Sequence, residues 1–197
     1  MKPLFSFIFI FCISNSNIAK AQITKGFWQV GGDANFISST FSPYSSSANK
    51  QSRLEIAPTI GYFFFDKFSA GLKIDIAFSH SATDSTASGS GFTTNASSYL
   101  FGPYMRYYFL NEEKALNFFA EANYGYGLGV SKNYGMSRNT TKSQQFTFMA
   151  GPEFFFTQSV GLEFTIGYYY YKQTGINPGS KGFQMGLGFM IHLERDN

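Results

Sequence analysis

Period-two alternation of apolar with small or polar residues constrains the fold of this chain more than any other feature. Successive side chains of a strand point to opposite sides, so the alternation predicts β-strands with one apolar face. Phe68, Leu72 and Ile76, for example, share one face of a stretch whose other face carries Lys73 and Asp75. The eight predicted strands are residues 27–37, 53–65, 68–79, 99–109, 116–130, 145–156, 160–171 and 183–193.

The connections between these stretches alternate in length. The short ones are residues 66–67, 111–115 and 158–159, whereas 38–52, 80–98, 131–144 and 172–181 are long and rich in Ser, Thr, Gly and Asn. This order predicts an up-and-down meander with every long connection at one end. Strands of about 11 to 13 residues suit a tilted membrane crossing. We therefore expect an all-β fold, an eight-stranded antiparallel up-and-down transmembrane β-barrel with four long external loops and both termini in the periplasm.

The direction of the apolar faces leaves an alternative. A soluble lipocalin also has eight strands, with its apolar side chains inside, and Gly26-Phe27-Trp28 matches the Gly-x-Trp of that family. The exterior of such a barrel would here consist mainly of Gly, Tyr, Thr and a few charges, since charged residues make up only 14% of the chain. Aromatic residues also gather near strand ends, as in interfacial girdles. We favour apolar faces that point to lipid.

The opposite faces then line a narrow interior. A barrel of eight strands is just wide enough for side chains, and an unpaired buried charge is costly. We therefore predict a structural network of ion pairs, with a gated pore or proton path as the open alternative. Its members are Asp33, Arg53, Glu55, Lys73, Asp75, Arg106, Glu121, Glu153 and Glu163.

Two local features lie outside this scheme. Residues 1–21 read as a secretory signal peptide, with Lys2, a short apolar stretch and a cleavage site at Ala21, so residues 22–197 form the predicted barrel domain. Cleavage removes Cys12, the single Cys, and with it any disulfide or thiolate site.

The predicted strands contain three prolines. Proline removes a ladder donor, so Pro58, Pro103 and Pro152 are candidate β-bulges.

Catalytic and ligand-binding motifs are weak. Some lipid-modifying enzymes use a His together with a Ser and an acid. Such residue types lie close together in this sequence at His80, Ser81, Asp84 and Ser85. These four residues fall where a Ser/Thr-rich connection begins, so their proximity is expected by chance. We predict no enzyme and no cofactor. We also predict no metal site, because no His, Cys, Asp and Glu cluster has metal-ligand spacing. The formal charge of +3 argues against a nucleic-acid binder. Asp84-Ser85-Thr86 is similar to an O-glycosylation motif.

The last predicted strand carries the sharpest match to a known family. Gln184, Gly186, Phe189 and Ile191 fit a polar, x, Gly, x, x, apolar, x, apolar pattern. With the rest of residues 27–193, the chain resembles small outer-membrane β-barrel proteins of the OmpA-barrel and OmpX type. It departs from them in ending on His192-Leu193 and a polar tail in place of a terminal aromatic residue. The resemblance implies a Gram-negative outer membrane, an insertion signal read by the barrel assembly machinery, and periplasmic chaperones as partners.

We expect a non-enzymatic protein with a structural or surface-interaction role, and the sequence does not name a surface ligand. The alternatives are a narrow pore or small-solute transporter and, further off, a lipid A-modifying enzyme or a soluble binder. The long connections are basic, which suits contact with anionic lipopolysaccharide among the outer-membrane lipids. Their cations are Lys50, Lys132, Arg138, Lys142, Lys172 and Lys181.

Overall fold

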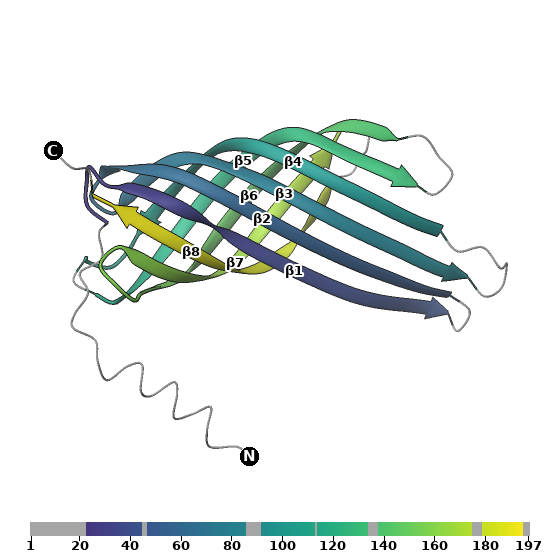
Figure 1. The fold of residues 1–197 in the computed structure, drawn as a ribbon, viewed down its shortest axis with the longest axis horizontal. Helices are drawn as coiled ribbons and strands as arrows, with labels where there is room; N and C mark the ends of the chain where they lie inside the picture. The colour runs from purple at the N-terminus through teal and green to yellow at the C-terminus, as the bar shows by residue number, and fades with distance from the viewer. Residues whose placement is uncertain are drawn as a thin grey trace, which may run out of the picture.

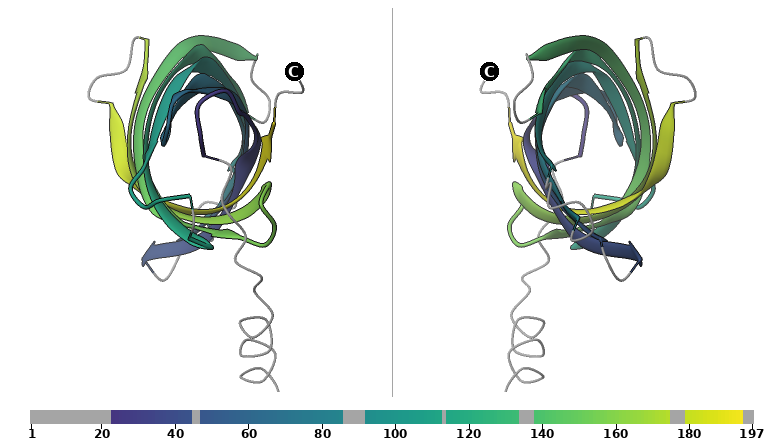
Figure 2. Two further views of the ribbon diagram at one scale, coloured as in Figure 1. Left: turned by 90° about the vertical axis from the view of Figure 1, so that its left-hand side faces the viewer. Right: turned by 90° about the vertical axis from the view of Figure 1, so that its right-hand side faces the viewer.

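The computed structural model describes residues 23–44, 47–85, 92–112, 114–133, 138–174 and 179–194, and these form a closed antiparallel barrel (Figure 1). Each strand pairs with the next along the chain, and the last pairs with the first, as the end-on views show (Figure 2). The predicted all-β, eight-stranded fold is confirmed. The strands are β1 (Trp28–Tyr44), β2 (Ser47–Phe65), β3 (Phe68–Ser85), β4 (Phe92–Tyr108), β5 (Leu116–Asn133), β6 (Asn139–Phe155), β7 (Val160–Gln173) and β8 (Ser180–Leu193).

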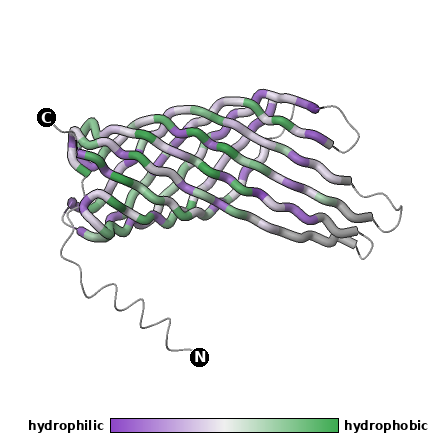
Figure 3. The backbone as a smooth tube through the Cα atoms, viewed as in Figure 1, coloured by the Kyte–Doolittle hydropathy of each residue, from purple (hydrophilic) through white to green (hydrophobic). Residues whose placement is uncertain are grey.

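The apolar faces point outward. Leu72 is 45% exposed, while its neighbour Lys73 is 2% exposed inside the barrel. Hydropathy alternates in the same way along the backbone (Figure 3). The outward apolar side chains form a band that runs on β3 from Phe68 to Phe78, close to the roughly 9–11 residues of a tilted membrane-crossing strand. The lipocalin alternative is therefore wrong, because a soluble barrel would turn these residues inward.

The strands continue beyond the apolar band. The β2–β3 ladder starts at Ser47↔Ser85 and β4 begins at Phe92, so most of the predicted long loops belong to strands. The loop boundaries 38–52, 80–98, 131–144 and 172–181 are thus wrong. Ladder hydrogen bonds use backbone groups and need no apolar face. Where both faces are polar the period-two pattern disappears, although the backbone goes on pairing.

The two ends of the barrel differ. We call the end with the short turns the turn end and the opposite one the open end. Lys67 turns the chain between β2 and β3 with a φ of 67°. Its backbone N–H donates to the carbonyl of Ile23 at 2.8 Å, which holds the segment before β1 against the turn end. Both the start of β1 and the end of β8 therefore lie there (Figure 1).

The three strand prolines interrupt the ladder without shifting it. On both sides of Pro58, Pro103 and Pro152 the pairing keeps one register, so the expectation of bulges is wrong. Loss of one N–H donor removes a bond but inserts no extra residue into the strand. The register shifts instead at the two ends of β2, between Phe63 and Phe65 and opposite Phe41–Tyr44.

No helix among the described residues has the length and apolar character needed to cross a membrane.

A charge placed on the apolar band tests its orientation. Leu72→Arg should lower the free energy of unfolding by about 2–4 kcal/mol, because the cation faces hydrocarbon near the middle of the band. Ser52→Arg, on the polar part of β2, should change it by less than about 1 kcal/mol. Urea unfolding in lipid vesicles, followed by the mobility of unboiled samples on gels, measures both. Equal losses at the two positions would contradict the assignment.

Candidate functional site

The lumen holds a chain of buried ion pairs with Arg106 at its centre. From β4, its Nη2 lies 2.6 Å and its Nε 2.9 Å from Glu121 Oε2 on β5. Across the lumen on β7, the Glu163 carboxylate accepts hydrogen bonds from Arg106 Nη1 and, at 3.2 Å, from Arg106 Nη2. The guanidinium also stacks over the ring of Phe119, 4.1 Å from its centroid. Carboxylates from β5 and β7 thus hold one cation in place.

Glu121 links this cation to a second one. Its Oε1 accepts from Lys73 Nζ on β3 at 3.0 Å, and Lys73 also donates to Asp33 on β1 at 2.7 Å. All of these side chains are buried. An ion pair in such a site stabilises a protein only when its geometry is good and its polar atoms are satisfied. One continuous series of side chains meets that condition and connects β1, β3, β5 and β7 to β4. Its members are Asp33, Lys73, Glu121, Arg106 and Glu163.

The hydrogen-bond chain continues toward the turn end through Tyr108. Arg106 donates to the Tyr108 oxygen at 3.2 Å, and that hydroxyl donates to Glu153 at 2.7 Å. Glu153 also contacts His192 Nε2 at 3.0 Å. Gln29 donates to Tyr108 at 2.9 Å and accepts from Ser69 at 2.8 Å. A continuous polar network therefore joins the middle of the lumen to its turn end.

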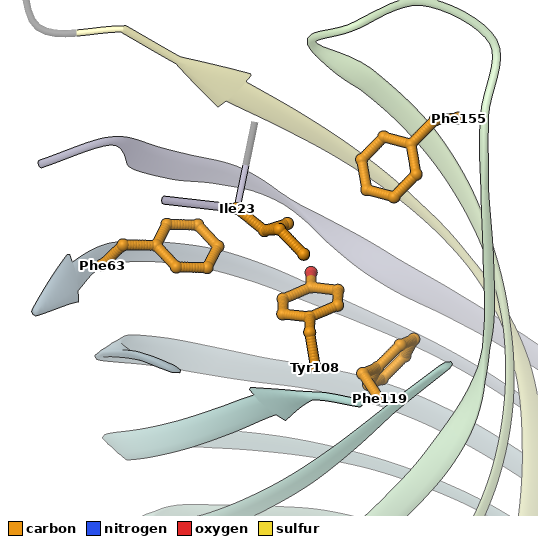
Figure 4. Close-up of a cluster of buried hydrophobic side chains, with 5 residues drawn as sticks. All are labelled: Ile23, Phe63, Tyr108, Phe119 and Phe155. Atoms are coloured by element: carbon orange, nitrogen blue, oxygen red, sulfur yellow. The ribbon is translucent and has the colours of Figure 1, made fainter. Parts of the chain in front are cut away.

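An apolar plug, defined by Ile23, Phe63, Tyr108, Phe119 and Phe155, closes the turn end (Figure 4). The rings of Phe63 and Phe119 each lie 5.9 Å from that of Tyr108, and Phe155 lies 5.3 Å from the His192 ring. Every member of the plug is buried. Aromatic pairs at these separations attract one another beyond the area they bury.

The open end contains a polar cavity instead, which we call the vestibule. Its volume is about 380 Å³, and its wall includes Arg53, Glu55, Tyr169, Tyr171 and Gln184. Arg53 Nη2 lies 2.8 Å from Glu55, but the Arg53 side chain is 42% exposed. This pair is separate from the central network. The lumen is thus filled at one end and hollow at the other.

The structure brings together most of the predicted interior charges. One network holds Asp33, Lys73, Arg106, Glu121 and Glu163. Glu153 joins it through Tyr108, and Arg53 pairs with Glu55. Asp75 is buried near Gly125 and makes no ion pair with the described residues.

Sequence reasoning did not find the plug or the His192–Glu153 contact. Phe63, Phe119 and Phe155 occupy inward positions of the period-two pattern, so the signal was present. Ile23 lies before the first strand and carries no such signal.

The remaining sequence motifs are dispersed. His80 is exposed, and its Nδ1 lies 2.7 Å from the Asn95 side-chain oxygen on β4. The side chains of Asp84, Ser85 and Thr86 lie outside the described residues. Of the insertion-signal residues, Gln184 and Gly186 face the lumen, whereas Phe189 and Ile191 face outward. Among the described residues, no three His, Cys, Asp or Glu side chains gather as a metal site requires.

One comparison with known proteins, the match to a family model, assigns a family. The family model described as outer membrane protein beta-barrel domain matches residues 5–190. The N-terminal β-barrel domain of Pseudomonas aeruginosa OprF is 15% identical, with a TM-score of 0.49 over 86% of this chain and 98% of that one. Neisserial surface protein A is 17% identical, with a TM-score of 0.44 over 87% of this chain and 98% of its own. A search of curated proteins finds no match.

Removal of the shared carboxylate tests the central network. Glu121→Gln should destabilise the barrel by about 3–5 kcal/mol, because it leaves two buried cations each short of a partner. Glu55→Gln is the matched control and should cost about 1 kcal/mol or less, since Arg53 reaches solvent. The same urea titration in vesicles gives both values. A loss for Glu121→Gln no larger than that of the control would count against the network.

Proposed function

We propose that this chain, which belongs to the family of outer membrane protein beta-barrel domains, is a non-enzymatic protein that anchors an interaction surface in the outer membrane. One observation carries the proposal: the lumen is closed by the ion-pair network and the plug. A closed lumen suits a rigid support rather than a channel. The contacts with a partner are then made at the open end, where the polar parts of the strands extend past the apolar band.

The proposal includes an orientation and a processing step. Residues 1–21 act as the signal peptide of a Gram-negative bacterium, and the mature chain starts after Ala21; the structure does not describe these residues. The turn end faces the periplasm and the open end faces outward. The burial of Ile23 at the turn end supports this assignment, because it keeps the start of the mature chain there.

The proposed partners follow from the membrane location. The barrel assembly machinery inserts the chain by reading Gln184, Gly186, Phe189 and Ile191, after periplasmic chaperones have delivered it. Lipid covers the apolar band, and lipopolysaccharide contacts its outer margin.

An enzymatic role finds little support in the side chains near His80. Among the described residues, the imidazole contacts the amide oxygen of Asn95, and His80 lies on the outer face of the barrel. A nucleophile needs a base within hydrogen-bond reach. We therefore propose no lipid A-modifying activity.

Conductance separates a closed support from a narrow pore. In planar bilayers the protein should show no steady single-channel current, because Arg106 and Glu121 are fixed by several partners across the lumen. Heat-dependent gel mobility of the same sample serves as the control for a folded, inserted barrel. Steady openings of the folded protein would replace the proposal with the pore alternative.

Surface labelling of intact cells tests the orientation. An epitope inserted after residue 88, between β3 and β4, should be accessible to antibody, because this connection lies at the open end. The matched control has the same epitope after Glu112, between β4 and β5 at the turn end, and should be labelled only in broken cells. The reverse pattern would invert the proposed topology.

A further inference from the structure

The vestibule has the size and the wall of a small-molecule site. Its volume of about 380 Å³ lies within the range of roughly 300–1,000 Å³ of ligand pockets. Small side chains on three neighbouring strands keep it open, among them Ala77, Ala96, Ser98 and Gly129. On the opposite wall lie larger polar and aromatic groups from β6, β7 and β8. The walls therefore combine space with hydrogen-bonding groups.

Among the described residues, two buried atoms of this wall have no hydrogen-bond partner. They are Asn35 Oδ1 and Ser98 Oγ. Asn35 is only 8% exposed and its amide lines the vestibule from β1. A buried polar atom without a partner costs free energy, so native structures rarely keep one without a reason. A bound group that carries hydroxyls would hydrogen-bond to the Asn35 amide once the Asn35 side chain has rotated.

The charges of the vestibule favour an uncharged ligand. Arg53 and Glu55 are its only charged wall residues among those described, and they neutralise each other at 2.8 Å. The rest of the polar wall consists of amides and hydroxyls, which both donate and accept. Tyr169 and Tyr171 add aromatic rings, which can pack against the C–H groups of a ring-shaped ligand. Amides, hydroxyls and aromatic rings together suit a polyhydroxylated ring such as a sugar.

The ladder between β1 and β8 is incomplete beside the vestibule. Pairing between β1 and β8 ends at Ala34↔Leu187, so the rest of β1 pairs only with β2 and the start of β8 only with β7. Figure 1 shows the two strands side by side at the turn end and apart toward the open end. Asn35 and Gln184, which line the vestibule, are beside this seam. Outside it, Phe36 is 70% and Phe183 81% exposed.

We propose that the vestibule binds a neutral polyhydroxylated group, and that the β1–β8 seam admits this group as the head of a membrane glycolipid. The sugar then contacts Asn35, Ser98 and Gln184, while its acyl chains stay outside against Phe36 and Phe183. The site deepens the proposed interaction role and rests on it. Its test is nevertheless independent, because a failed titration would leave the conductance and labelling results unchanged.

Native mass spectrometry of the detergent-purified barrel measures the binding. Three lipids with the same acyl chains are titrated in separate experiments: digalactosyl diacylglycerol, phosphatidylcholine and phosphatidylglycerol. Free lactose is titrated in a fourth experiment. We expect a one-to-one complex with the glycolipid at an apparent affinity at least about fivefold higher than for either phospholipid, as a few additional hydrogen bonds would give. Similar affinities for all three lipids would overturn the proposal.

Three variants assign the binding to the vestibule. Asn35→Leu should weaken glycolipid binding about fivefold, by removing one hydrogen-bonding group, and Ala77→Leu should do so by filling the cavity. Asn123→Leu is the matched control: Asn123 is buried and has an unpartnered Nδ2, but it does not line the vestibule. Folding of each variant is verified by heat-dependent gel mobility. Unchanged binding by folded Asn35→Leu and Ala77→Leu would overturn the site.

Free lactose identifies the source of the group. Glycolipid binding that is much tighter than lactose binding supports entry through the seam. Lactose binding of equal strength, lost in Asn35→Leu, supports the site but overturns the role of the seam, since the group would then come from the medium.

Discussion

The rest of the structure depends on one constraint, the pairing of every backbone N–H and C=O that faces hydrocarbon. Lipid offers these groups no partner, so strands can cross a membrane only in a closed ladder. The pairing of β8 with β1 supplies that closure, and the antiparallel order lets each strand pair with its chain neighbour. Once the ladder is closed, alternate side chains must meet lipid or lumen. Leu72 and Lys73, adjacent in sequence, therefore lie in opposite environments.

Closure also explains why the lumen charges are shared rather than paired one to one. The interior of an eight-stranded barrel is narrow, so side chains from non-adjacent strands reach one another. Glu121 on β5 contacts both Lys73 on β3 and Arg106 on β4, and Arg106 reaches Glu163 on β7. Each buried cation thus faces more than one carboxylate, which offsets the loss of hydration. The same narrowness lets five apolar side chains close the turn end.

The sequence predicted the fold, the strand order and the outward faces, because alternation reports directly on two environments. The prediction of strand ends failed where the sequence no longer alternates between apolar and polar residues. Around Thr83 and Thr93 residues on both faces are mostly polar or small, so the sequence predicts a loop where the structure has a paired strand. The sequence could list the inward charges but not their partners, since the stagger between strands decides that Lys73 meets Glu121 and Asp33. Ile23 was missed because a residue outside a strand has no period, and its position depends on tertiary contacts, a backbone hydrogen bond to Lys67 and packing in the plug.

The early end of the β1–β8 ladder connects the closed fold to its open end. β1 continues to Tyr44 and β8 starts at Ser180, but the two strands pair only from Trp28↔Leu193 to Ala34↔Leu187, so the ladder does not close along its whole height. The β1–β8 seam begins at Ala34↔Leu187, beside outward-facing Phe36 and Met185, which places unpaired strand edges at the margin of the apolar band. Such edges need polar partners or cover. Hydroxyls of the proposed headgroup, seated in the vestibule behind the seam, would supply polar partners to both edges. The feature that leaves the barrel incompletely paired is therefore also the one that gives it a site.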